Sequence, residues 1–524
     1  MRNISGHIKT LFISVLLLFL FIPEAFSQYV KSSVSLAKTH NSGVNWIDID
    51  GDGDLDLSIS GDDLGYSYGF GKLYLNSGSP TFTISYKRDI RAIEDGDQKW
   101  SDFNNDGYPD LLYAGEDVGR IAGIDTFKVS DAALPYYNKY SGFTAVSDGS
   151  VDWGDYDNDG DYDVLIAGQD ASGLIVTDLY RNDRSAFTKV NAGLPGVILG
   201  KVAFIDYDLD MDLDIFISGR DINTNKYTRL WKNTGGAFQV TSDVFVNLEF
   251  SQFDWGDFND DGYPDLILGG SSIGIALGYI YYNNSGTGFT LSGMKVPGAR
   301  YGSSAFGDVD NDGDLDAFIS GYKAKKIFRD KYIFLNNGTD SLIPLTSFTS
   351  DTVSRSFIQF GDYNSDNKLD FVTNGMDAYS NGLTYIADNT TATANTKPSA
   401  PQNLHSTVEG KNVILSWDPS TDNNTAPKAL TYNIYMGKTS GGINVVSPNA
   451  SIATGFRRVS RQGYIQDTAW MIRNLPVGIY HWGVQAMDNA LGASAFSAEE
   501  IFEIKERFTK VPYTEDPSST SPAV

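Results

Sequence analysis

The sequence predicts an all-β fold with two parts, a closed ring of repeated sheets and a smaller β-sandwich after it. Three observations support this prediction. An acidic motif recurs seven times, apolar residues alternate with a period of two after each copy, and the composition changes near residue 399. With 524 residues, the chain is long enough for two or three domains.

The repeat is defined by the pattern Asp-x-Asp/Asn-x-Asp-x-x-x-Asp. Consecutive copies are 51 to 54 residues apart. The copies, called units one to seven, start at Asp48, Asp102, Asp155, Asp206, Asp257, Asp308 and Asp362. An aromatic residue lies two positions before each start, at Trp46, Trp100, Trp153, Phe204, Trp255, Phe306 and Phe360. A glycine lies thirteen positions after each start, so three features recur in one register.

Each unit reads as short antiparallel strands separated by turns. A run such as 55–59 follows the acidic motif, and an aromatic strand such as 332–336 ends at Asn. About 51 residues suit one four-stranded blade, and seven such units suit a closed, seven-bladed β-propeller.

The two ends of the repeat region predict how the ring closes. Unit seven runs through its third strand and lacks a fourth, whereas residues 29–36 precede unit one and resemble a fourth strand. We expect this N-terminal segment to complete unit seven, which would remove two open sheet edges. The alternative is an open solenoid with an unpaired first strand.

The charge and composition exclude several classes of protein. The chain has 66 acidic and 40 basic residues, a net charge of −26, which disfavours binding to nucleic acid or to anionic lipid. It has no cysteine, so disulfides, thiolate metal sites and cysteine nucleophiles are excluded.

Residues 1–27 have the layout of a secretory signal peptide. A basic start precedes an apolar run, and Ala25-Phe26-Ser27 offers small residues at a cleavage site. The alternative is a membrane anchor, but twelve apolar residues are fewer than the roughly 20 that a span needs. We therefore expect a secreted or surface-exposed protein with no transmembrane segment in the mature chain.

The acidic motif itself predicts a calcium site. In unit three, Asp155, Asp157, Asp159 and Asp163 occupy positions 1, 3, 5 and 9 and can converge on one centre. Hard oxygen ligands without nitrogen or sulfur suit calcium. Position 12 lacks the bidentate Glu of an EF-hand, and the flanking segments read as strands, so an EF-hand is rejected.

The motif between two strands resembles the FG-GAP (VCBS) repeat of integrin α-subunit propellers, over residues 28–388. The resemblance implies a seven-bladed propeller with calcium in the hairpin between the first two strands of each blade, and partners on the opposite face. It assigns four ligand positions per unit: Asp48, Asp50, Asp52 and Asp56; Asp102, Asn104, Asp106 and Asp110; Asp155, Asp157, Asp159 and Asp163; Asp206, Asp208, Asp210 and Asp214; Asp257, Asn259, Asp261 and Asp265; Asp308, Asp310, Asp312 and Asp316; Asp362, Asn364, Asp366 and Asp370.

Two of the seven sites depart from the pattern at position 6, where five units have glycine. Unit four has Met211 there, and a side chain in the left-handed region costs about 1–2 kcal/mol. Unit seven has Asn367 followed by Lys368. We predict up to seven Ca²⁺ ions, with weaker binding in units four and seven. The expected role of the ions is structural, because crowded carboxylates repel one another unless a cation neutralises them.

The turns on the opposite face carry a second set of acidic residues. Five units read Gly-x-Asp after the second strand, which places Asp63, Asp117, Asp170, Asp221 and Asp377 there. These side chains could attract a basic or carbohydrate partner. The simpler interpretation, which we favour, is that they accept hydrogen bonds from the amides of their own turns.

No motif indicates catalysis. His40, His405 and His481 are scattered, and neither a nucleophile elbow nor a zinc signature is present. Our first hypothesis is therefore a non-catalytic adhesion or interaction module with an extracellular protein or glycan as partner. The alternatives are a lectin-like propeller and a polysaccharide-degrading hydrolase or lyase.

The C-terminal part is predicted to be a separate domain. Residues 389–398 read as a linker, and residues 399–505 resemble a fibronectin type III sandwich, with Tyr480 suited to a tyrosine corner. Such a domain is usually a spacer or docking module. Residues 506–524 are polar and rich in Pro and Ser, which predicts a disordered tail.

Overall fold

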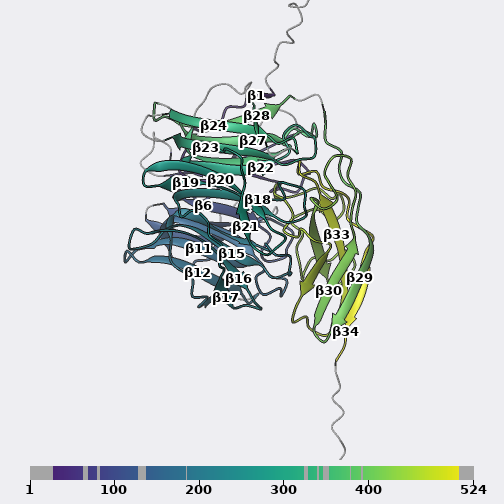
Figure 1. Ribbon diagram of the computed structural model, residues 1–524. Coiled ribbons are helices and arrows are strands. Elements are labelled where there is room, and N and C mark those ends of the chain that lie inside the picture. The colour runs from purple at the N-terminus through teal and green to yellow at the C-terminus, as the bar shows by residue number, and fades with distance from the viewer. Residues whose placement is uncertain are drawn as a thin grey trace, which may run out of the picture.

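A computed structural model shows a β-protein with two parts lying side by side (Figure 1). It describes residues 28–62, 69–78, 83–117, 119–127, 137–184, 186–323, 328–338, 341–345, 353–377, 379–390 and 393–506. Within these ranges every regular element is a strand, and no helix has the length and apolarity to cross a membrane. The predicted signal peptide and almost the whole predicted tail lie outside them.

The repeat region forms sheets of four antiparallel strands in sequence order. Unit one contains β2 (Val44–Ile47), β3 (Asp56–Gly61), β4 (Phe70–Leu75) and β5 (Thr83–Asp89). Unit two contains β6 (Glu94–Ser101), β7 (Asp110–Glu116), β8 (Arg120–Thr126) and β9 (Tyr137–Tyr140). Unit three contains β10 (Val146–Gly154), β11 (Asp163–Asp170), β12 (Ile175–Asn182) and β13 (Phe187–Val190). One bridge, Val146 to Ile121, joins the sheets of units two and three.

The remaining units repeat this order. Unit four contains β14 (Ile198–Ile205), β15 (Asp214–Arg220), β16 (Lys226–Asn233) and β17 (Phe238–Val240). Unit five contains β18 (Glu249–Gly256), β19 (Asp265–Ser272), β20 (Ile275–Asn283) and β21 (Phe289–Leu291). Unit six contains β22 (Arg300–Gly307), β23 (Asp316–Lys323), β24 (Phe328–Leu335) and β25 (Ile343–Pro344). Unit seven supplies β26 (Ser354–Gly361), β27 (Asp370–Met376) and β28 (Gly382–Asn389).

The N-terminal strand completes unit seven, as predicted. In β1 (Tyr29–Lys31), Tyr29 pairs with Asn389 and Lys31 pairs with Ala387 of β28. Figure 1 shows β1 beside β28, although the two strands lie at opposite ends of the repeat region. The open solenoid is thereby rejected, because the first strand is paired.

An asparagine at the end of the third strand links neighbouring units. In unit four, the side-chain amide of Asn233 donates to Tyr156 O of unit three at 2.8 Å. In unit one, Asn76 donates to Tyr363 O of unit seven at 2.9 Å, so the link also spans the closure. Six units carry this amide, at Asn76, Asn182, Asn233, Asn283, Asn336 and Asn389. Unit two has the buried Phe127 instead and lacks the link.

The C-terminal part consists of two three-stranded sheets around one core. The first contains β29 (Gln402–Glu409), β30 (Asn412–Asp418) and β32 (Ala469–Ile472). The second contains β31 (Thr431–Gly437), β33 (Gly478–Met487) and β34 (Glu500–Ile504). Leu415 of the first sheet and Trp482 of the second are fully buried in the same cluster. Tyr480 donates to Pro476 O at 2.6 Å, the hydrogen bond of a tyrosine corner.

The C-terminal domain is docked directly on the acidic loops of the ring. Arg473 pairs with Asp212 at 2.6 Å, and Ser447 Oγ donates to Asp102 Oδ2 at the same distance. Backbone and amide hydrogen bonds also join this domain to the loops of units one, three and six. The sequence analysis did not predict this contact between the C-terminal domain and the acidic loops.

Candidate metal centres

The seven acidic loops occupy equivalent places in the fold. Each connects the first and second strands of its unit, as between β10 and β11 or between β14 and β15. This is the hairpin that the FG-GAP resemblance implied, and the flanking strands agree with the rejection of an EF-hand.

Backbone amides hold the carboxylates of each loop in place. In unit three, Asp155 accepts hydrogen bonds from the amides of Asp159 and Gly160 at 3.0 and 2.9 Å. Asp163 at position 9 accepts from the amides of Tyr156 and Asn182 at 3.0 and 2.7 Å. These bonds fix the side chains before any cation binds, so the geometry of the loop is largely preformed.

Five loops bring three carboxylates close enough to share one ion. In each, one oxygen per residue lies within 4.8 Å of the others. The groups are Asp48, Asp50 and Asp56; Asp155, Asp157 and Asp163; Asp206, Asp208 and Asp210; Asp308, Asp310 and Asp316; Asp362, Asp366 and Asp370. The predicted ligands of units two and five do not meet this criterion; asparagine at position 3 is not the reason by itself, because unit seven also has it, at Asn364, and meets the criterion.

Buried oxygens without partners show that a cation fits these loops. A buried acceptor usually has at least one hydrogen bond, so exceptions require a cause. At position 3, four such oxygens accept none within the described ranges: Asn104 Oδ1, Asp157 Oδ1, Asp208 Oδ1 and Asp310 Oδ1. An all-oxygen set of carboxylates and amides is the donor chemistry of calcium.

The electrostatics of the loops also favour a cation. Burial, reinforced by Asp50 nearby, raises the pKa of Asp56 to about 8. Burial and the neighbouring carboxylates raise the pKa of Asp308 to about 8 and that of Asp214 to about 9. The loops of units one, four and six therefore hold protons at neutral pH unless a metal ion replaces them.

Unit four differs from the others in backbone strain. Positions 4 and 6 have positive φ in every loop, and in unit three Asn158 and Gly160 adopt it easily. In unit four, Leu209 and Met211 have φ of 58° and 70°. The expected strain at Met211 is thus present, and Leu209 adds a second strained residue that the sequence analysis did not consider.

Lysine side chains stand beside the ligands of units four and seven. Lys232 on β16 contacts Asp208 and lies 3.1 Å from Asp210. Lys368 lies 3.7 Å from Asp366. Sequence analysis missed Lys232. Every unit has an equivalent position at the end of its third strand, so comparing the residues at that position would have found it. In both units a lysine partly neutralises the carboxylates that a metal ion would otherwise neutralise.

The acidic turns on the other face follow the simpler interpretation. Asp170 accepts from the amides of Ser172 and Leu174, and Asp377 accepts from those of Tyr379 and Asn381. Asp221 accepts from the amide of Asn225 in the same way. These three side chains stabilise their own turns. Asp117 pairs with Arg91 at 3.7 Å, and Asp63 lies outside the described residues.

Comparison with known proteins supports the repeat. The FG-GAP-like repeat family matches residues 257–319, from the unit-five loop to the strand after the unit-six loop. No curated protein matches the chain. Among solved structures, a thermostable family-43 glycoside hydrolase is similar over 48% of this chain and 90% of its own, with 10% identity and a TM-score of 0.27.

Proposed function

We propose that the protein is a secreted, calcium-stabilised seven-bladed β-propeller with a fibronectin type III-like domain, and that it acts as a non-catalytic interaction module. The repeated loops carry this proposal. Their carboxylates gather within 4.8 Å in five units, and position 3 leaves buried oxygens for a cation. The four-stranded units, with β1 paired to β28, support the closed ring.

Calcium would act as a structural ion that links the two domains. Ser447 donates to Asp102, the first ligand position of unit two, and Asp48 N donates to Arg458 O at 2.8 Å. A cation that neutralises these loops would therefore also stabilise the surface on which the C-terminal domain rests. The opposite face of the ring would then carry the partner site.

The metal part is tested by equilibrium dialysis of the full chain against ⁴⁵Ca²⁺. We expect five to seven bound ions, the two weakest in units four and seven, and little competition from Mg²⁺, which requires stricter octahedral geometry. Binding of fewer than three ions, or equal preference for Mg²⁺, would contradict the assignment.

The interaction part is tested by screening the calcium-loaded chain on a glycan array and against extracellular proteins. Binding that is lost on chelation supports the module. Turnover of a polysaccharide by the purified chain would replace this proposal with the enzymatic alternative.

A further inference from the structure

The first strands of all seven units surround a partly open space in the middle of the ring. This central cavity has a volume of about 400 Å³, within the range of cavities that hold small ligands. One side is formed by residues 459–464 of the C-terminal domain, which reach in between the strands. The cavity is therefore shared between the two domains.

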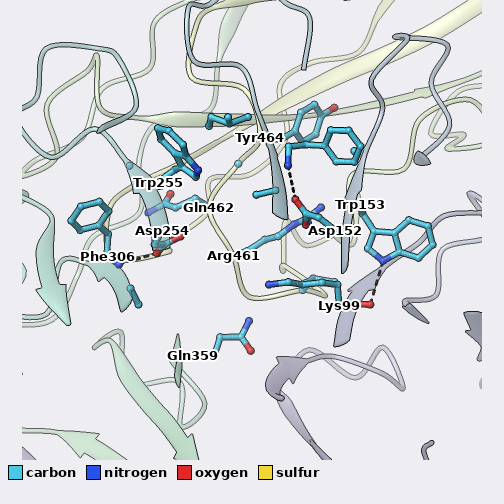
Figure 2. Close-up of a pocket in the computed structure, with 18 of the residues that line it drawn as sticks. Lys99, Asp152, Trp153, Asp254, Trp255, Phe306, Gln359, Arg461, Gln462 and Tyr464 are labelled. Carbon is cyan, nitrogen blue, oxygen red and sulfur yellow. Dashed lines mark hydrogen bonds between the residues drawn. The ribbon is translucent and has the colours of Figure 1, made fainter. Parts of the chain in front are cut away.

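Three cationic side chains line this cavity: Lys99 on β6, Lys201 on β14 and Arg461 of the C-terminal domain. Figure 2 shows Lys99 and Arg461 in the same space as Asp152 and Asp254. In the described part of the chain, none of the three cations donates a hydrogen bond or lies within 4.0 Å of a carboxylate oxygen. Lys201 instead lies 5.8 Å from the ring centre of Phe357. Their hydrogen-bonding capacity is unused.

Three of the acidic and amide side chains of the cavity are already engaged. Asp152 accepts from the amide of Phe204 and Asp254 from that of Phe306, both at 2.9 Å, as the dashed lines in Figure 2 show. Gln359 accepts from the amide of Trp46 at 2.6 Å. These bonds join neighbouring units, so the three side chains have a structural role and retain only their remaining lone pairs.

The cavity thus has several donors without a partner. Lys and Arg together bring many N–H groups and no acceptor. Two further buried donors, Trp255 Nε1 and Gln462 Nε2, also lack a hydrogen-bond partner in the described residues. Burial and the nearby Lys99 lower the pKa of Lys201, whereas Asp97, Asp152 and Asp254 outweigh burial and raise the pKa of Lys99, so cations and carboxylates are intermixed in the cavity. Because Lys99, Lys201 and Arg461 share the cavity with carboxylates that include Asp97, Asp152 and Asp254, the site suits a molecule that offers a carboxylate to the cations and hydroxyl donors to the acids.

We propose that the central cavity binds a sugar acid of monosaccharide size, a carboxylate that also carries hydroxyl groups. The carboxylate would be bound by Lys99, Lys201 and Arg461. The hydroxyls would donate to the free lone pairs of Asp152 and Asp254, and accept from Trp255 and Gln462. This inference requires the folded ring but does not depend on a role in adhesion.

Isothermal titration calorimetry of the calcium-loaded full chain tests the proposal. The probes are sodium D-glucuronate, D-galacturonate and D-mannuronate, with D-glucose, sodium acetate and sodium phosphate as comparisons. We expect saturable binding of at least one uronate, and binding of glucose and acetate at least about tenfold weaker. No binding of any uronate, equal binding of glucose, or binding of phosphate alone would overturn the proposal.

Substitutions locate the binding in the cavity. Lys99→Gln and Arg461→Gln are expected to weaken uronate binding about tenfold each. Lys438→Gln removes the same charge at an exposed position of the C-terminal domain and should leave binding unchanged. Each variant is first checked for an unaltered calcium-dependent melt, and Lys201→Gln replaces any variant that does not fold. Unchanged affinity in the cavity variants would refute the location. A chain that binds calcium normally but no uronate would refute this inference alone.

Discussion

The loops of units three and four both have aspartate at positions 1, 3, 5 and 9, but the negative charge of these aspartates is compensated differently. Unit three has Gly160 at the left-handed sixth position, whereas unit four has Met211 there. A basic side chain stands just before the asparagine in both units. Arg181 of unit three pairs with Asp183 at 2.8 Å, whereas Lys232 of unit four turns to the ligand carboxylates. The comparison shows that a loop's neighbours, as well as its own sequence, determine how well it can hold a metal ion.

Removing calcium is expected to have the largest effect, because it acts on unit three and its equivalents together. At tenfold excess over Kd, each occupied site adds about 1.4 kcal/mol to the free energy of unfolding. Chelation should therefore lower the melting temperature by on the order of 10 °C, with recovery on adding Ca²⁺. Differential scanning calorimetry measures this, and an unchanged melt in metal-free protein would show that the ions do not stabilise the fold.

The pH dependence of the metal-free protein is the second prediction. Burial raises the pKa of Asp56 and Asp308 to about 8, far above the value near 4 of an unfolded aspartate. The folded state therefore binds more protons than the unfolded state between about pH 4 and pH 8, and stability must fall as pH rises through this window. Urea denaturation at pH 5 and pH 8 measures the trend. Saturating calcium should abolish it, and a metal-free protein that gains stability toward pH 8 would contradict the argument.

Exchanging the residues at position 6 tests the strain directly. Gly160→Met places a side chain at φ 93°, and its Cβ would lie 2.7 Å from Val445 O. We expect a loss of about 2–3 kcal/mol in the free energy of unfolding. The reciprocal change, Met211→Gly, relieves strain and should add about 1 kcal/mol. Equal effects of the two changes on urea denaturation would show that strain does not distinguish the loops.

The smallest expected effect concerns the lysine of unit four. Lys232→Gln removes the charge beside Asp208 and Asp210, so calcium affinity of this site should rise about three- to tenfold. The matched control is Arg181→Gln in unit three, where the arginine pairs with Asp183 and acts on the ligand Asp157 only electrostatically, so calcium affinity should rise less. Calcium titrations followed by calorimetry measure both. An affinity that rises equally in the two variants would indicate a general charge effect.

Much of the ring could be predicted from the sequence because its determinants repeat. The FG-GAP resemblance implied that the loops lie in hairpins. The missing fourth strand of unit seven pointed to residues 29–36 as its replacement, and residues 29–31 of this segment form β1. The seven-blade count and the number of bound ions stay predictions. The regular pattern was informative because each unit repeats the same local interactions.

The features that sequence analysis missed depend on single contacts without a repeat. Ser447 and Arg473 reach the acidic loops from a domain with its own pattern, and nothing in their surroundings indicates that contact. Arg461 enters the cavity from a segment without regular strand structure. Lys232 differs from these residues, because it can be found by aligning the seven units and comparing the residue just before the asparagine that ends the third strand. Irregular interdomain contacts thus need coordinates, whereas departures within a repeat can be found by comparing copies.

The pairing of β1 with β28 has a consequence for how the chain matures. Tyr29 is among the first residues of the ring to leave the ribosome, and its partner Asn389 follows 360 residues later. The first strand, β1, therefore stays unpaired until nearly the whole repeat region has been synthesised. Closure pairs the two ends of the repeat region, which are far apart in the sequence. It is therefore a late and slow step of folding. A protein truncated before residue 389 would expose two unpaired strand edges and would be prone to aggregation and proteolysis.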